Sequence, residues 1–453
     1  MTKLYHIRFV KNLRIFLAIT LLLSGVAVSG QVTITVPEPN SASKWSIYEL
    51  SFDSDESVFT NPFWDVTITG IFTGPSSQVL KMEGFYFDTN TWKLRFSPTQ
   101  SGIWNYSVTF HSNAVSQVFN GSMECLPAQE GNHGFINISD SNPYRFMFSD
   151  STYMIVNGIN GHTPGVTAAV LGIPNGPYPA DSLMTEIMWQ YLASKNINAY
   201  RLQMFHQTWA PPVFEWNPFE GCANLLYNSG GLDRYDVDNA RLIDKWLSRA
   251  AQNGVNLYPC LFTIHEDLVG YFFNQSPWSV ENGGYYTNPT NMYTTANDEG
   301  HEYVKKYVRY VVNRYAAFRN IIAWEYNNEW GKYTSADWLN SLDTVITNSD
   351  PYGRAHVESY WGYDYSYDSE LHDLASNEIV DFHVYPLFGY TEFNMDSLLS
   401  EQMSFFMKNM RNPSILENLA AEIMKPTFLP KAIILTELDI GPPLYPADRH
   451  YTG

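Results

Sequence analysis

The chain has 453 residues, of which 45% are hydrophobic and 16% aromatic, which is enough for a large core and for two or three domains. Its formal net charge of −19 argues against nucleic acid or anionic membranes as partners, because both select basic surfaces, and it favours a neutral ligand over a polyanion. The three cysteines, Cys125, Cys222 and Cys260, are too few for a disulfide framework and predict three buried free thiols, with a single bridge as the alternative. No CxxC or Cys/His spacing suggests structural zinc.

Residues 1–30 have the pattern of a secretory signal peptide. Four basic residues precede an apolar run from Ile15 to Val28, and the small residues Ser29 and Gly30 follow it. The run is too short, and too closely followed by polar sequence, for a stable membrane span. We therefore expect a mature protein that begins near residue 31 and is secreted, periplasmic or at the cell surface.

Residues 31–126 are predicted to form short strands separated by turns. Segments such as "WSIYELSF", "FWDVTITGIF" and "IWNYSVTF" are rich in β-branched and aromatic residues, and Pro, Gly, Ser, Asn and Asp separate them. About seven such strands within about 95 residues predict an immunoglobulin-like β-sandwich. The Cys…Trp…Cys core signature of antibody domains is absent from the sequence.

From residue 135 to residue 453 the pattern changes to alternating strands and helices. A small hairpin is predicted around "GFINIS" and "RFMFSDS", and "YMIVNG" is predicted as the first strand of the alternating part. Apolar strands such as "INAYRLQMF" and "KAIILTELDIG" then alternate with helical segments. This α/β pattern indicates a parallel sheet covered by helices, and about seven strands over about 300 residues predict a (β/α)8 TIM barrel.

The predicted barrel lacks one strand–helix unit. The sequence stops at Gly453, soon after the seventh predicted strand, and a seven-stranded ring would leave sheet edges without partners. We therefore expect the barrel to be truncated after strand 7 and the chain to be a fragment of a longer protein. The alternative is an open α/β sheet.

Two glutamates end predicted barrel strands. Glu329 ends the fourth strand, in "AWEYNNEW", and Glu437 ends the seventh, in "IILTELD". Catalytic groups of such barrels lie at the carboxyl ends of the strands, and cleavage of a glycosidic bond needs two carboxyl groups across a pocket. Each glutamate alone is more simply a solvated charge, but the pair favours catalysis. Glu325 shares a face of the strand with Glu329 and is predicted to be a buried, paired charge.

These segments resemble the signature strands of clan A retaining glycoside hydrolases, and most closely those of the cellulase and mannanase type known as family 5. "AWEYNNEW" resembles the fourth strand of that clan, and "IILTELD" the seventh. "NAYRLQ" is similar to the second-strand arginine motif and "DFHVYP" to the sixth-strand His-x-Tyr motif. The resemblance covers residues 135 to 440, and the preceding segment looks like the immunoglobulin-like domain of unknown function found ahead of such barrels.

The resemblance implies a role for each matching residue. Glu329 would be the general acid/base and Glu437 the nucleophile. Asn328 would hydrogen-bond the 2-hydroxyl of the sugar, and Arg201 and Tyr385 would keep Glu437 ionised, since a guanidinium and a phenol beside a carboxylate lower its pKa. His383 and, with a looser motif match, His265 would line the same subsite.

Several aromatic residues follow predicted strand ends, where their rings could stack on the faces of sugars. Trp330 and Trp361 are predicted to bind substrate in this way, within a group that also contains Trp278. For any single ring, the alternative is ordinary packing of a long loop against the barrel.

Together these features predict a secreted retaining β-glycoside hydrolase. It would cleave a polysaccharide or oligosaccharide by double displacement, with two glutamates and no cofactor. One alternative is a non-catalytic glycan-binding or adhesion protein on a barrel scaffold. The other is an inverting or apiosidase-like glycosidase.

Overall fold

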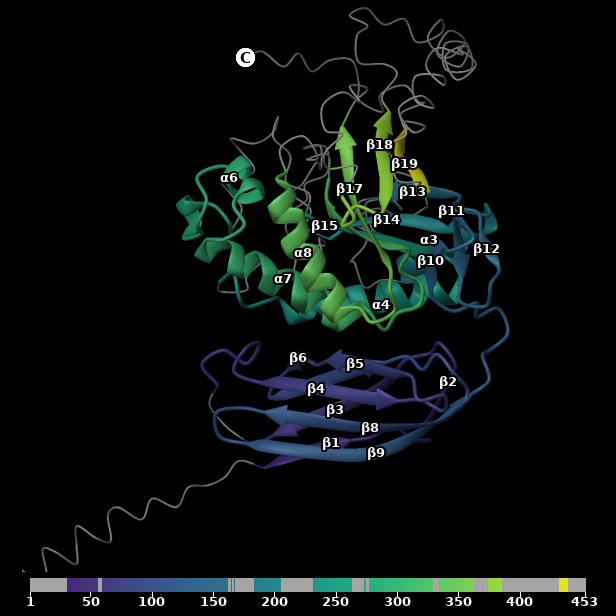
Figure 1. The fold of residues 1–453 in the computed structure, drawn as a ribbon, viewed down its shortest axis with the longest axis vertical. Coiled ribbons are helices and arrows are strands. Elements are labelled where there is room, and N and C mark those ends of the chain that lie inside the picture. The colour runs from purple at the N-terminus through teal and green to yellow at the C-terminus, as the bar shows by residue number, and fades with distance from the viewer. Residues whose placement is uncertain are drawn as a thin grey trace, which may run out of the picture.

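The computed structural model describes most of the chain between residues 31 and 384 and one later strand (Figure 1). The described ranges are 31–55, 59–161, 183–204, 231–262, 277–328, 334–361, 374–384 and 432–438, with the single positions Pro164, Thr167, Phe273 and Leu371. For residues 183–185, 360–361, 380, 382–384 and 432–438 the description is of the backbone alone.

Two packed sheets at the N-terminus confirm the predicted sandwich, with nine strands rather than about seven. One sheet has the order β1-β3-β7-β6 and the other the order β2-β9-β8-β4-β5. The strands are β1 (Val32–Thr35), β2 (Ser41–Ser43), β3 (Tyr48–Ser54), β4 (Thr67–Thr73), β5 (Val79–Glu83), β6 (Phe85–Asp88), β7 (Thr91–Phe96), β8 (Gly102–His111) and β9 (Ser116–Leu126).

The sandwich core follows from strict alternation along the strands. In β8, every second residue from Trp104 to Phe110 is buried, while the residues between them are exposed or half-buried. The rings of Phe72 and Phe96 stack across the two sheets with their centroids 4.0 Å apart. Cys125 is a buried free thiol in this core, as predicted.

A small antiparallel sheet connects the sandwich to the rest of the chain. It consists of β10 (Ile136–Ser139), β11 (Asn142–Phe148) and β12 (Tyr153–Met154). The prediction that "YMIVNG" is the first parallel strand was wrong, because Tyr153 and Met154 pair antiparallel with Met147 and Phe146. A short turn brings these residues together at a smaller entropic cost than a distant parallel pairing would have.

Seven parallel strands follow in consecutive order, each hydrogen-bonded to the next. They are β13 (Gly158–Gly161), β14 (Ala199–Gln203), β15 (Asn256–Phe262), β16 (Ala323–Asn327), β17 (Ala355–Trp361), β18 (Ile379–Val384) and β19 (Ala432–Leu438). The two strands at the ends of this order, β13 and β19, also contact each other, so the sheet curls toward a ring. The region is a partial (β/α) barrel, and the expected eighth unit has no counterpart among the described residues and stays a prediction.

Helices cover the outside of this sheet (Figure 1). They are α3 (Leu183–Ser194), α4 (Val237–Gln252), α6 (Pro289–Thr294), α7 (Glu299–Tyr315) and α8 (Ala336–Ser349), with the short 3₁₀ helix η1 (Val280–Asn282). Asp236 caps α4 by accepting from the backbone N–H of Asn239 at 2.9 Å, and Asp298 caps α7 in the same way. Within the described part of the chain, no helix is long and apolar enough to cross a membrane.

Candidate active site

Three predicted site residues lie side by side at the carboxyl edge of the barrel sheet. Trp361 of β17 is in register with His383 of β18, and His383 is in register with Glu437 of β19. Each lies within the last two residues of its strand. The backbone therefore brings these three positions to one level, at the edge where barrel enzymes carry their chemistry.

Arg201, the middle residue of β14, is the centre of a buried polar network inside the barrel. Its Nε donates to Oε2 of Glu325 at 2.7 Å, and its Nη2 donates to Oε1 of the same carboxylate. Nη2 also donates to Oδ1 of Asn328 at 2.7 Å, and Nη1 donates to Oδ1 of Asn160 at 3.3 Å. The side chains of Arg201 and Glu325 are 2% and 0% exposed, so this two-pronged ion pair is shielded from water.

The prediction that Glu325 is a buried and paired charge is confirmed. Arg201 was expected from the family resemblance to hold Glu437, whereas its described partners are Glu325, Asn328 and Asn160. The side chain of Glu437 belongs to the part of the chain outside the description, so the expected Arg201–Glu437 contact stays a prediction.

The Arg201 contact fixes the orientation of the Asn328 amide. A guanidinium can only donate hydrogen bonds, so the atom of Asn328 that faces it must be the amide oxygen. The amide nitrogen of Asn328 is then directed elsewhere with its two N–H groups. The backbone N–H of Asn328 donates to the carbonyl oxygen of Phe262 at 2.9 Å, which holds the main chain in place as well. Asn328 is thus preset as a donor at the end of β16.

Tyr258, which is in register with Arg201 on the neighbouring strand, forms a second polar pair with Asp381. The Tyr258 hydroxyl donates to Oδ2 of Asp381 at 3.0 Å, and both residues are buried. Burial raises the pKa of Tyr258 far above its ordinary value, and Asp381 and Glu325 raise it further, so the phenol stays neutral and acts as a donor. Burial likewise raises the pKa of the free Cys260 thiol, with Glu325 adding to the effect, which leaves Cys260 unreactive.

Glu358 of β17 is a buried carboxyl whose hydrogen bonding is incomplete. Its Oε1 accepts from the Thr334 hydroxyl at 3.1 Å. Among the described residues, its Oε2 has no hydrogen-bond partner, and neither does the side-chain amide of the buried Asn327. Burial raises the pKa of Glu358 well above its ordinary value of 4.5, against the hydrogen bond from Thr334, and the charges of Glu325 and Asp381 raise it further. The carboxyl therefore keeps its proton to a higher pH in the folded protein than in the unfolded chain.

Glu358 should make the protein less stable as the pH rises. A raised folded pKa gives stability that is complete below the unfolded pKa of about 4.5 and is lost progressively above it. We expect Glu358→Gln to flatten this dependence, so that the variant gains stability relative to the parent between about pH 5 and pH 8. Denaturant unfolding across that range measures the difference. Parallel curves for parent and variant would contradict the assignment, and Glu302→Gln on the exposed face of α7 is the control.

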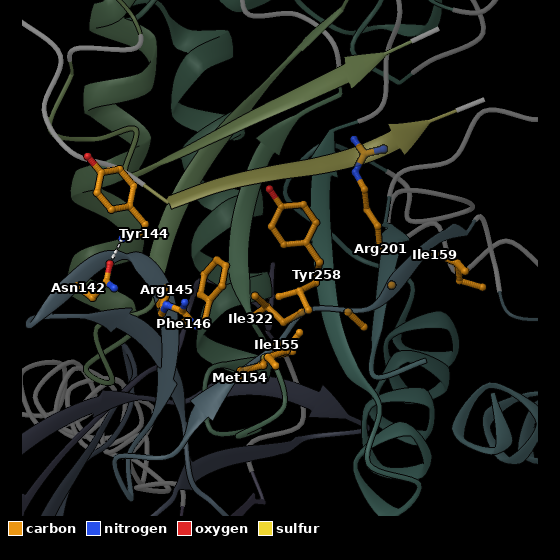
Figure 2. Close-up of a pocket in the computed structure, with 13 residues that line it drawn as sticks. Asn142, Tyr144, Arg145, Phe146, Met154, Ile155, Ile159, Arg201, Tyr258 and Ile322 are labelled. Carbon is orange, nitrogen blue, oxygen red and sulfur yellow. Dashed lines mark hydrogen bonds between the residues drawn. The ribbon is translucent and has the colours of Figure 1, made fainter. Parts of the chain in front are cut away.

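A cavity of about 720 Å³ lies beneath the polar network, between the small sheet and the barrel. Figure 2 shows Arg201 and Tyr258 in its upper part and Phe146 and Met154 below them. Ile322, which directly precedes β16, and Ala199, the first residue of β14, also line it, so the cavity lies against the amino ends of these strands. We therefore place the candidate site at the opposite edge, where the strand ends carry polar groups.

Several predicted site residues lie outside the described part of the chain, namely Glu329, Trp330, His265 and Tyr385. Glu329 directly follows Asn328 in the sequence, and Asn328 is the residue that Arg201 holds. Trp278 is fully buried in the barrel core, as the packing alternative expects. Among the described residues, no group of His, Cys, Asp and Glu is placed to hold a metal ion.

Sequence reasoning missed Asn160 and the Tyr258–Asp381 pair as members of the network. Asn160 lies in the glycine-rich segment "NGING", where its only signal was a polar residue in a short strand. Asp381 lies in the "DFHVYP" segment, where it is buried and bonded to Tyr258. Such partners come from distant strands, so no local pattern reveals them.

The sandwich matches a known family of domains. Residues 41–111 fit the family described as a domain of unknown function, DUF5060. This match covers a minority of the chain and does not extend to the barrel. No curated protein matches the sequence.

The fold is similar to that of solved glycoside hydrolases. A candidate glycoside hydrolase from Bacteroides vulgatus ATCC 8482 aligns with a TM-score of 0.55 at 18% identity, over 76% of this chain and 60% of that one. A family 5 mannosidase from Rhizomucor miehei aligns with a TM-score of 0.46 at 15% identity, over 67% of this chain and 72% of that one. A β-glucuronidase from Lactobacillus rhamnosus aligns with a TM-score of 0.39 at 10% identity, over 90% of this chain and 53% of that one.

The first of these similarities shows that the fold resembles that of a glycoside hydrolase. Its sequence identity of 18% supports a statement about the fold alone. This chain spans 60% of the Bacteroides protein's length.

Proposed function

We propose that this protein is a secreted retaining β-glycoside hydrolase that acts on a polysaccharide or oligosaccharide. The observation that carries the proposal is the Asn328 amide, which Arg201 holds by its oxygen at the carboxyl end of β16. A fixed N–H donor at that point suits a sugar hydroxyl, and the residue that follows it is Glu329. A carboxyl group beside such a donor fits the chemistry of glycoside cleavage.

The catalytic roles are assigned to Glu329 and Glu437. In the first step, the Glu437 carboxylate attacks the anomeric carbon while Glu329 gives its proton to the departing glycosidic oxygen. In the second step, Glu329 takes a proton from water, the water oxygen attacks the anomeric carbon, and Glu437 leaves as a carboxylate. The anomeric configuration is retained after the two inversions, and no cofactor takes part.

The remaining predicted residues are assigned to substrate binding. Asn328 donates to the 2-hydroxyl, a contact that strengthens as positive charge develops at the anomeric carbon. His383 is assigned to the same subsite as Glu437, which is supported by their shared register. Arg201 and Tyr385 are assigned to the same subsite, where they would hold Glu437 ionised, and the residues assigned to sugar contacts are His265, Trp330 and Trp361.

The proposal also covers location. The signal-like segment of residues 1–30 supports export, to the periplasm, the cell surface or the medium.

Covalent trapping tests the proposed chemistry on the full chain. A glycoside with fluorine at C2 and a good leaving group should inactivate the enzyme and leave one sugar on the peptide that contains Glu437. The fluorine slows both steps, and the good leaving group keeps the first step fast enough for the intermediate to accumulate. A panel of activated sugars covers the unknown glycan. Binding to polysaccharides without turnover or labelling would favour the glycan-binding alternative, and inverted products would favour the inverting one.

A further inference from the structure

One face of the sandwich is built to meet the barrel rather than water. In the β3–β7–β6 sheet, alternate residues point away from the sandwich core, and among them are Phe85, Phe87, Arg95 and Glu49. A solvent-facing sheet would not place two phenylalanines there. Phe85 is 4% exposed and belongs to the same continuous apolar cluster as the barrel helices α4 and α7.

A buried charge network joins the two domains. Arg95 of β7 donates to Glu49 at 2.8 Å, to Oδ1 of Asp244 on α4 at 2.6 Å, and to the carbonyl oxygen of Arg314 on α7 at 2.9 Å. Arg314 in turn donates to Oδ2 of Asp244 at 2.7 Å. Both guanidinium groups lie against the ring of Phe85, at 5.0 and 5.1 Å from its centroid.

The Asp244 carboxylate shows that this network is electrostatically satisfied. Burial alone would raise its pKa, but Arg95 and Arg314 outweigh burial and hold the pKa below its ordinary value. One carboxylate thus joins an arginine of the sandwich to an arginine of the barrel. Without the sandwich, Asp244 would keep Arg314 but lose the hydrogen bond from Arg95, and without the barrel, Arg95 would keep only Glu49.

The barrel also contributes a side chain to the sandwich core. Tyr352, in the turn after α8, stacks on Phe135 with ring centroids 4.0 Å apart and belongs to the apolar cluster of the sandwich. Its hydroxyl accepts from the backbone N–H of Ser97 at 2.7 Å, and the Ser97 hydroxyl donates to the carbonyl oxygen of Ala317 at 2.8 Å. Each domain therefore inserts an aromatic residue into the other's core.

Contacts continue along both edges of this interface. On one side, Nε1 of Trp64 donates to the carbonyl oxygen of Asp233 at 2.9 Å, and Phe63 meets Tyr235 edge to face. On the other side, Arg309 of α7 pairs with Glu83 of β5 at 2.6 Å. The interface is therefore broad and does not depend on one contact.

The opposite face of the sandwich does not look like a sugar-binding surface. In β4, β5, β8 and β9, the residues that alternate outward are mainly Thr, Ser and Asn with scattered aliphatics such as Ile103, and none is Phe, Tyr or Trp. Flat glycan-binding faces use exposed aromatic rings for stacking. Figure 1 places the sandwich next to α4 and α7, with the carboxyl ends of β17 and β18 pointing away from it.

We propose that the domain of unknown function is a fixed base of the barrel, which folds with it as one cooperative unit, and is not a mobile carbohydrate-binding module. The proposal rests on the reciprocal insertion of Phe85 and Tyr352 and on the shared Asp244 network. It does not depend on the catalytic assignment. In this proposal the sandwich supports the barrel from the side away from the candidate active site.

Calorimetry and hydrogen exchange of the full chain test this proposal with Phe85→Ala. The parent should unfold in one transition. The variant should also unfold in one transition, about 5 °C lower, because a lost core phenylalanine is spread over about 420 residues. If the domains were independent, the parent would show two transitions, and Phe85→Ala would lower neither by the amount of a lost core residue, because the Phe85 ring points away from the sandwich core.

Native-state hydrogen exchange should show the same coupling. Phe85→Ala should speed exchange in β16 and β17, which do not touch the sandwich, as well as in β8 and β9. If Phe85→Ala fails to fold, Tyr352→Phe takes its place. It removes only the acceptor for the Ser97 N–H and should speed exchange in both domains by a smaller amount. Ile103→Ala, on the exposed face, is the matched control and should change neither. Two transitions in the parent, or faster exchange confined to the mutated domain, would overturn the proposal.

Discussion

Glu437→Ala is expected to abolish turnover of every glycan substrate. Without the carboxylate no glycosyl-enzyme intermediate can form, so the loss should exceed the about 10²- to 10⁴-fold typical of removing a general acid. Glu329→Ala should lose about that factor on natural glycans, but it should keep the first step for leaving groups that need no proton. Steady-state and burst kinetics on a natural glycan and on an activated aryl glycoside measure both effects.

Azide distinguishes the two assigned roles. In Glu329→Ala, azide should replace water in the second step and give a glycosyl azide of the substrate's configuration. In Glu437→Ala, azide should displace the leaving group directly and give the opposite anomer. Exchanged anomers would mean that the two roles are reversed, and full activity in both variants would exclude the mechanism. Glu302→Ala, an exposed carboxylate on α7, should behave as the parent does.

The sequence predicted the layers of this fold because its patterns are local. Alternation in β8 and continuous burial in β14 to β16 separate a two-faced sandwich strand from a central parallel strand. The error at "YMIVNG" shows the limit of such patterns. A short apolar run has the same composition in a hairpin and in a barrel, and only the pairing of Tyr153 with Met147 decides between them.

The candidate site was less predictable than the fold. The predicted strand ends indicated that Asn328, His383 and Glu437 lie near one another at the carboxyl edge of the sheet, because the carboxyl ends of parallel strands meet there. The choice of partners was not predictable, since Arg201 and Glu325 are separated by 124 residues and meet only when β14 and β16 are in place. A family motif carries over a residue type at a position, but it does not fix which of two buried carboxylates an arginine contacts.

Variants of the Arg201 network can measure its effects on stability and on catalysis separately. Arg201→Met should show the effect on stability. Removing the guanidinium leaves the fully buried Glu325 without its ion-pair partner, which is expected to cost about 3–5 kcal/mol. Adding Glu325→Gln removes the unpaired charge, so the double variant should recover part of that loss, with a coupling energy of about 0.5–3 kcal/mol. Denaturant unfolding of the parent, both single variants and the double variant measures the cycle.

Activity should not recover in the double variant, because the Asn328 amide has still lost the donor that orients it. We expect a fall of about 10²-fold in kcat with little change in KM, as for a preset donor that acts mainly in the transition state. Asn328→Asp should lose activity similarly, since it cannot donate to the sugar. A double variant that recovered both stability and turnover would show that Arg201 is a structural residue alone. Stability without turnover would place its main function in holding Asn328 for the substrate.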